Sequence, residues 1–239
     1  MKHIVKILAT IVLLAFIPSY AEYITYLYPP LAYPYTGRER YIGVILGQPT
    51  IPYMGYKSAG IGVVVGSGRQ GKVGRIQGHL FMMFSRYKSS YERINAFSMP
   101  HVGWSLELTP RISNNVLLRF GLGFRLGLDF VSIKSEYPVK PAPFYFSTPI
   151  NLLIGSQITL NSDVILSFRQ DLSLYYLFSG ILYKTWNKFH LFDEGGGTAI
   201  VIKAKDHFSL YFGTQPFILK HGIINWMIGF TYTFSHPEG

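Results

Sequence analysis

The chain has 239 residues, of which 49% are hydrophobic, 16% are aromatic and only 14% are charged. Ordinary soluble domains carry about 25% charged residues, so the composition departs from that class. The formal charge of +10 is compatible with nucleic acid or with anionic lipid headgroups as partners. Because the chain has no cysteine, disulfides and lipid-modified cysteines are excluded.

The first residues have the pattern of an export signal. Lys2, His3 and Lys6 precede or flank the start of an apolar run at residues 7–17, and a small-x-small pattern ends at Ala21. The run is shorter than the roughly 20 residues that a membrane-spanning helix needs, and no longer run follows it. We therefore expect residues 1–21 to be a cleaved signal peptide, with an uncleaved inner-membrane anchor as the alternative.

Residues 22–37 combine three prolines with many tyrosines, and we expect them to form an N-terminal lead-in rather than a strand. Beyond them, apolar side chains alternate with small or charged ones. The longest alternation, at residues 116–130, puts large apolar groups on one face and mostly glycine and charge on the other. A strand of this length would reach roughly 50 Å, which predicts a membrane-spanning β-strand.

The alternation recurs in ten segments, at about residues 41–46, 60–65, 75–84, 101–108, 116–130, 150–159, 164–176, 198–202, 207–213 and 222–234. An even number of strands is typical of single-chain outer-membrane barrels. The sequence therefore predicts an all-β fold, an antiparallel up-and-down transmembrane β-barrel of about ten strands at residues 38–234, with eight strands as the alternative. Soluble β-sandwiches and lipocalin-like barrels also alternate, but glycine beside charge suits a crowded barrel interior better than a solvated face.

The predicted connections have two lengths. Short turns are expected at residues 66–72, 109–114, 161–163 and 203–206, and longer segments at residues 47–56, 86–97, 131–147, 179–197 and 214–221. In outer-membrane barrels the short turns face the periplasm and the long loops face outside. Both chain ends are then expected on the periplasmic side.

The last predicted strand carries Gly229, Tyr232 and Phe234 on a fixed spacing. This pattern resembles the C-terminal targeting signal of bacterial outer-membrane β-barrel proteins, which has a glycine, an aromatic residue and a terminal phenylalanine at these intervals. Two departures are Met227, where the signal has a polar residue, and a predicted tail at residues 235–239 beyond the phenylalanine. The resemblance implies residence in the cell outer membrane and recognition by the barrel-assembly machinery, and it names no subfamily.

Strand parity directs nine ionisable side chains into the predicted barrel: Arg75, His79, His101, Glu107, Arg119, Arg125, Asp129, Arg169 and Asp171. A barrel of about ten strands has little room, and an unpaired charge inside it is costly. We therefore expect these groups to form a structural ion-pair network, with Arg169 and Asp171 as partners of the charges at 119, 125 and 129. The alternative is a solute path. Their spacing selects no reaction, so no catalytic residue, metal or cofactor is predicted.

Basic residues are concentrated in the predicted outer segments, and those expected to contact lipid phosphates are Lys88, Arg93, Lys134, Lys140, Lys184 and Lys188. Lipopolysaccharide phosphates would attract such a set, whereas the alternative is ordinary solvated loop charge. The expected partners are thus outer-membrane lipid and lipopolysaccharide, and nucleic acid is not among them.

One enzymatic alternative depends on His207 and Ser209, whose His-x-Ser spacing is similar to that of outer-membrane lipid A deacylases. Leu210 and Tyr211 replace the asparagine and alanine that follow the serine in those enzymes. The leading prediction is therefore a non-catalytic outer-membrane barrel of a Gram-negative-type bacterium, with a structural or adhesive role or a narrow small-solute pore. The alternatives are a lipid A-modifying hydrolase and a secreted soluble β-barrel that binds an apolar ligand.

Overall fold

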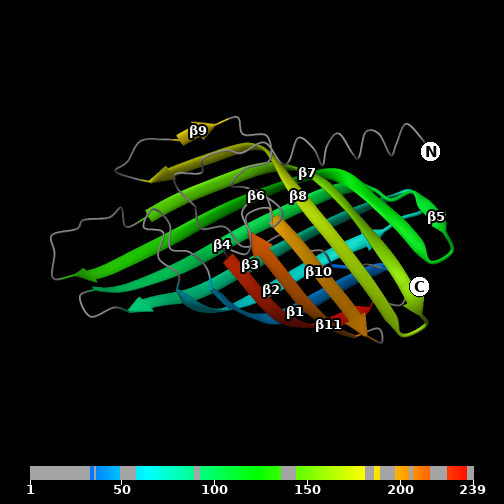
Figure 1. The fold of residues 1–239 in the computed structure, drawn as a ribbon, viewed down its shortest axis with the longest axis horizontal. Helices are drawn as coiled ribbons and strands as arrows, with labels where there is room; N and C mark the ends of the chain where they lie inside the picture. Colours follow the sequence, from blue (N-terminus) through cyan, green and yellow to red (C-terminus); the bar gives the residue numbers. More distant parts are fainter. Residues whose placement is uncertain are drawn as a thin grey trace.

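The described part of the chain is built from β-strands. The computed structural model describes residues 33–34, 36–48, 58–88, 92–135, 144–180, 186–188, 197–204, 207–215 and 225–235. Ten strands form a closed antiparallel barrel, and the first, β1 (Arg38–Gln48), pairs with the last, β12 (Asn225–Ser235), to close the ring (Figure 1). The predicted ten-stranded barrel is confirmed, and the alternative of eight strands is wrong. The predicted signal peptide lies outside the described residues.

The strands between these two follow the chain around the barrel. They are β2 (Ala59–Gln70), β3 (Gly74–Lys88), β4 (Glu92–Leu108), β6 (Val116–Ser135), β7 (Phe144–Asn161), β8 (Val164–Gly180), β10 (Gly197–Ala204) and β11 (Phe208–Gln215). Two three-residue strands add to this ring: β5 (Arg111–Ser113) pairs with β6, and β9 (Trp186–Lys188) pairs with β8.

The two ends of the barrel differ in their connections, as predicted. At the turn end, two to seven residues link β2 to β3, β4 to β6, β7 to β8 and β10 to β11, and the described chain ends lie there too. At the other, or loop, end the strands extend further than expected. The loops predicted at residues 86–97, 131–147 and 179–197 were therefore too long, because β3, β4, β6, β7 and β8 occupy part of each.

Two prolines lie where the sequence pattern missed the extensions of β4 and β7. An extra residue on β4 between Ser98 and Val102, beside Pro100, shifts the register against both neighbouring strands. Such a bulge shifts the alternation of inward and outward residues by one position, so the two parts of β4 do not form one continuous alternating pattern in the sequence. In β7 the pairing with β6 is interrupted beside Pro149, which has no N–H to donate.

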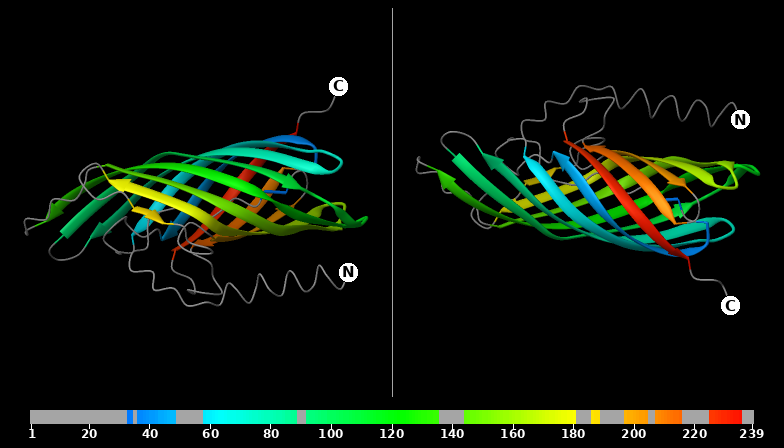
Figure 2. Two further views of the ribbon diagram at one scale, coloured as in Figure 1. Left: turned by 90° about the horizontal axis from the view of Figure 1, so that it is seen from above. Right: turned by 90° about the horizontal axis from the view of Figure 1, so that it is seen from below.

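The strands have unequal lengths. β1, β2, β10, β11 and β12 have 8 to 12 residues, close to the 9–11 residues, roughly, that a tilted strand needs to cross a bilayer. β3, β4, β6, β7 and β8 have 15 to 20 residues. The green strands consequently project beyond the blue and red ones at the loop end, in Figure 1 and in both views of Figure 2.

The two faces of the barrel wall have opposite chemistry. Large apolar side chains are exposed outside on every barrel strand for which side chains are described, including Leu46 on β1, Trp104 on β4 and Phe230 on β12. Arginine, glutamate, glutamine and serine are buried inside. A soluble barrel has the reverse arrangement, so the alternative of a secreted soluble β-barrel is inconsistent with the structure. The described residues include no helix long and apolar enough to span a membrane.

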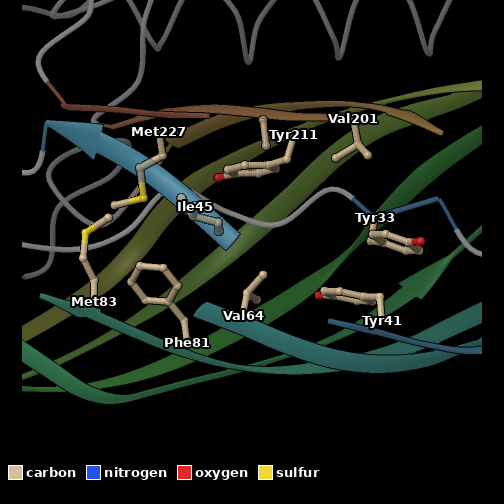
Figure 3. Packing of buried hydrophobic residues seen from close by; sticks show 10 residues of the cluster. Tyr33, Tyr41, Ile45, Val64, Phe81, Met83, Val201, Tyr211 and Met227 are labelled. Carbon is tan, nitrogen blue, oxygen red and sulfur yellow. The ribbon is translucent and has the colours of Figure 1, made fainter. Parts of the chain in front are cut away.

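One side of the interior is apolar. Side chains from β1, β2, β3, β10, β11 and β12 pack there, and Figure 3 shows Tyr41, Ile45, Val64, Phe81, Met83, Val201, Tyr211 and Met227 together with Tyr33. The Tyr41 ring covers Gly66, where a Cβ atom would lie 2.3 Å from the Tyr41 Cζ. A glycine at this position is therefore required for the ring to pack against the wall.

Candidate functional site: the charged interior of the barrel

The structure brings eight of the nine predicted interior residues inside the barrel. Arg75, His79, His101, Glu107, Arg119, Arg125, Arg169 and Asp171 are each at most 7% exposed. They lie on β3, β4, β6 and β8, where alternate residues face the lumen. The side chain of the ninth, Asp129, lies outside the described part of the structure.

Glu107 on β4 is the centre of this group. Arg119 on β6 donates to both of its carboxylate oxygens, from Nε at 2.6 Å and from Nη2 at 3.0 Å. Ser105 Oγ donates to Oε1 at 2.9 Å and Gln77 Nε2 donates at 3.3 Å. Arg119 also donates from Nη1 to Ser167 Oγ on β8 at 2.7 Å, so the arginine connects β4, β6 and β8 along one side of the lumen. These charge-assisted bonds neutralise a carboxylate that burial alone would destabilise.

A second pair lies beside the first. Arg169 on β8 donates to both oxygens of Asp171, at 2.6 and 3.1 Å, and its Nη1 lies 3.6 Å from Glu107 Oε1. Arg169 also donates to Ser105 Oγ at 3.3 Å. Asp171, one expected partner for the charges at 119, 125 and 129, binds Arg169 instead of Arg119, whose carboxylate partner is Glu107 on the adjacent strand. The two pairs form one connected network that we call the lumen network.

Arg75 extends this polar packing toward the turn end. It donates to the Gln157 side chain on β7 and, from Nε at 2.8 Å, to Gln70 Oε1. Its Nη1 donates to the backbone oxygen of Tyr33 at 3.4 Å, and Gln70 donates in turn to Thr109 Oγ1 at 2.7 Å. One guanidinium thus connects β3 and β7, which are not neighbours in the ring, with the segment before β1.

Small neighbours make room for the long charged side chains, as the sequence pattern predicted. In the strand registers Glu107 lies opposite Gly121, and Arg119 lies opposite Gly155. Gly103 lies between His79 and Arg125 on the flanking strands, and the edge of the His101 ring meets Phe81 with centroids 6.1 Å apart. The charged and the apolar parts of the interior therefore meet where His101 contacts Phe81.

The sequence pattern missed one interior ion pair. Lys203 on β10 donates to Glu39 Oε2 on β1 at 2.9 Å, and both side chains are buried. Lys203 had been predicted in a turn, but it lies inside because Ala199, Val201 and Lys203 alternate with the exposed Ile200 and Ile202. That alternation is the signal that would have found it.

Tyr33, from the predicted lead-in, lies inside the barrel and was also missed. Its ring stacks on Tyr41, with centroids 4.2 Å apart, and its hydroxyl contacts Thr233 Oγ1 and accepts from Ser209 Oγ. Burial raises the pKa of Tyr33, which precedes the strands, to about 12. The chain before β1 therefore contributes to filling the turn end of the lumen. No pattern at residues 22–37 indicated this.

The residues of the predicted assembly signal lie on the barrel's closing strand. Tyr232 and Phe234 are exposed on the outer face of β12, and Gly229 faces inward, where a Cβ would lie 2.8 Å from Ile45 Cγ1. Met227, at the position that is usually polar, packs in the apolar part of the interior. β12 pairs with β1 over ten residues, so this strand forms the seam of the barrel.

The predicted lipid-phosphate residues are only partly described. Lys88 is exposed on β3, and the strand registers place Arg93 opposite Lys88 and Lys134 opposite Arg93. Three basic positions thus form one row across β3, β4 and β6 at the loop end, on strands rather than in the loops expected. Lys188 lies on β9. The side chains of Arg93, Lys134 and Lys188 lie outside the described part of the chain, as do residues Lys140 and Lys184.

His207 and Ser209 do not form a catalytic pair. His207 is exposed and stacks on Tyr232, with ring centroids 5.5 Å apart, whereas Ser209 is buried and donates to Tyr33. A nucleophile and its base must lie within hydrogen-bond reach. Among the described residues, no group of three or more histidine or acidic side chains is arranged to hold a metal ion.

Comparison with known proteins gives similarity in structure but not in sequence. No protein-family model matches the chain, and no curated protein matches it. Solved outer-membrane β-barrels are similar to it at low identity. The translocator domain of autotransporter NalP from Neisseria meningitidis is 10% identical, with 86% of this chain and 91% of that chain covered and a TM-score of 0.44.

Two further structures are similar to a comparable extent. The beta domain of the Bordetella autotransporter BrkA is 12% identical, with 84% and 100% of the two chains covered and a TM-score of 0.47. Ail, the attachment invasion locus protein of Yersinia pestis, is 14% identical, with 83% and 99% covered and a TM-score of 0.35. By its own geometry, a closed antiparallel ring of ten strands with an apolar outside and a charged inside, the chain is a β-barrel of the outer-membrane type.

Proposed function

We propose that the chain is an integral outer-membrane β-barrel with a side-chain-filled interior and a structural or adhesive role without catalysis. The observation that carries this proposal is that the outer face of the barrel is apolar and its interior contains ion pairs, the reverse of a soluble barrel. An apolar exterior is stable only in contact with lipid. In the proposed orientation the turn end faces the periplasm and the loop end faces outside.

The adhesive role is supported by the unequal strand lengths. β6 has 20 residues and would extend about 66 Å, well beyond what a tilted strand needs to cross a bilayer. Together with β3, β4, β7 and β8 it forms a projecting sheet on one side of the barrel. A rigid sheet above the membrane presents surface to another molecule without the entropy cost of ordering a loop.

A closed lumen is supported by the contacts that cross it. The Arg75–Gln157 bond joins β3 to β7 and the Lys203–Glu39 pair joins β10 to β1, so both connect strands that are not neighbours in the ring. Apolar side chains fill much of the remaining interior. Reconstitution into planar bilayers should therefore give no steady conductance. Reproducible conductance steps from the wild-type chain would instead favour the second candidate, a narrow small-solute pore along the charged residues.

The location is tested by fractionating cells that express the full chain. The protein should appear in the outer-membrane fraction and should migrate faster on a gel before boiling than after it, because a closed barrel resists unfolding by detergent. Recovery as a soluble periplasmic protein would refute the proposal.

We also propose that the barrel-assembly machinery recognises β12. Phe234→Ala should leave more of the chain unassembled in the periplasm. Phe230→Ala is the matched control, because Phe230 lies on the same outer face and both phenylalanines are 54% exposed. Equal assembly of the two variants would show that the terminal pattern is an ordinary amphipathic strand.

Lipopolysaccharide is the proposed partner of the basic row at Lys88, Arg93 and Lys134. Adjacent cations on neighbouring strands suit phosphate groups that lie in one plane above the membrane. Replacing all three by glutamine should lower the amount of lipid A that remains bound on purification. Unchanged retention would identify these residues as ordinary surface charge.

A further inference from the structure

We infer that an acidic phospholipid binds in a groove on the outer wall at the turn end of the barrel. The groove has a volume of about 630 Å³, and its outward-facing lining includes Arg38, Arg40, Ser67, Arg69, Ile76 and Trp104. The inference rests on the proposed membrane location, and it concerns the opposite end of the barrel from the basic row.

The strand registers arrange these residues in two rows around the wall. In the first row Arg38 lies opposite Arg69, and Arg69 lies opposite Ile76. In the second row Arg40 lies opposite Ser67, followed by Gly78 and then Trp104. Each row therefore begins with guanidinium groups on β1 or β2 and ends with an apolar side chain on β3 or β4.

Gly78 forms the hollow between the cationic and the apolar parts of the groove. It occupies an outward-facing position on β3, and a Cβ there would have Trp104 Cδ1 as its nearest neighbour, at 3.5 Å. Space for a side chain is thus present but unused. Trp104 is 49% exposed and stacks on Phe124, with centroids 5.3 Å apart, which holds the indole at the edge of the hollow.

The three arginines are not neutralised by the protein within its described part. All the ion pairs found there lie inside the barrel, and none includes Arg38, Arg40 or Arg69. Glu39 separates Arg38 from Arg40 in sequence, but its carboxylate faces the lumen and binds Lys203. Like charges directly opposite on adjacent strands, such as Arg38 and Arg69, destabilise a sheet. A bound anion would remove that repulsion.

The position of the groove matches the depth of lipid phosphates. On β1 the exposed residues change from Arg38 and Arg40 to Ile42 and Val44 toward the loop end, so the arginines mark the edge of the apolar belt. Guanidinium groups bind phosphate oxygens in pairs, and a hydrocarbon chain would contact Ile76 and Trp104. Because three cations meet there, a phospholipid with net negative charge, such as phosphatidylglycerol, is favoured over a zwitterionic one.

The test is native mass spectrometry of the folded full chain in neutral micelles, with added phosphatidylglycerol or with phosphatidylcholine of the same acyl chains. Phosphatidylglycerol should remain bound preferentially. Arg38→Gln/Arg69→Gln should weaken its binding on the order of tenfold or more. Arg86→Gln/Arg111→Gln is the matched control, because it removes two exposed arginines outside the groove and should bind as the wild type does.

Two further measurements make the outcome decisive. Gly78→Leu keeps all three arginines but fills the hollow, and it should also weaken phosphatidylglycerol binding. Inorganic phosphate should not displace the lipid; if it does, the groove is a site for free anions and the lipid assignment is overturned. Two outcomes would overturn the proposed lipid site and leave the proposed function intact, provided that the chains still migrate as folded barrels. One is equal binding of both lipids, and the other is an equal loss of phosphatidylglycerol binding in the control variant. A chain recovered as a soluble protein would overturn both.

Discussion

Replacing Glu107 by glutamine tests whether the lumen network holds the barrel together. The carboxylate is buried and accepts two bonds from Arg119, one from Ser105 and one from Gln77, while Arg169 lies 3.6 Å away. The amide of glutamine has almost the same volume but no charge. The substitution therefore leaves packing intact and leaves Arg119 as a buried cation without its carboxylate.

The expected cost follows from the geometry. Removing one partner of a buried ion pair costs about 3–5 kcal/mol. The glutamine oxygen still accepts one bond, and Arg169 retains Asp171, so we expect about 3 kcal/mol, at the lower end of that range. Arg119→Gln added to Glu107→Gln removes the uncompensated cation. The loss in free energy of unfolding for the double variant should then be smaller than the summed losses of the two single variants, by about 1.5 kcal/mol or more.

The measurement is urea unfolding of the barrel folded into lipid vesicles, followed by tryptophan fluorescence and by gel migration without boiling. Arg111→Gln, at an exposed position on β5, is the control and should change the free energy of unfolding by less than about 0.5 kcal/mol. If Glu107→Gln costs less than about 1 kcal/mol and the two costs are additive, the network does not stabilise the barrel and the reasoning is refuted.

Three further predictions concern the wall, the tyrosine packing and the turn end. Phe124→Arg, on the lipid face, should impair assembly at a cost of about 2–4 kcal/mol near the bilayer midplane, whereas Arg125→Gln, on the lumen face, should assemble; equal tolerance in a folding assay would mean that the faces are misassigned. Gly66→Ala should destabilise by about 1–3 kcal/mol in urea, because its Cβ would meet the Tyr41 ring, and Tyr41→Ser should relieve part of that cost. Because the folded-state pKa of Tyr33 is raised from 10.0 to about 12, its contribution to stability is complete below pH 10 and is lost as the pH rises through 12. Tyr33→Phe should abolish that component of the alkaline loss, and an unchanged pH profile would show that Tyr33 is not buried.

Much of the fold could be predicted because it depends on a local rule. Successive strand side chains point to opposite faces, so the period-two pattern identified the ten strands, the lipid face and the interior face without knowledge of any contact. The same rule directed Glu107, Arg119 and Arg169 inward. It failed locally beside Pro100, where one extra residue on β4 shifts the alternation. At Pro149 the β6–β7 pairing is interrupted, although the register is the same on both sides.

Which interior groups meet depends on how the strands are arranged around the closed ring. Arg119 pairs with Glu107 rather than with Asp171 because the stagger between strands sets which residues lie at one level, and that stagger is a property of the closed ring. The same holds for the Lys203–Glu39 pair, for Tyr33 inside the lumen and for the outer groove, each of which joins residues distant in sequence. The alternation of residues along a strand was sufficient to predict the face on which each side chain lies, because that alternation is a local property. The partners on that face depend on strand register and barrel closure, which bring together residues distant in the chain.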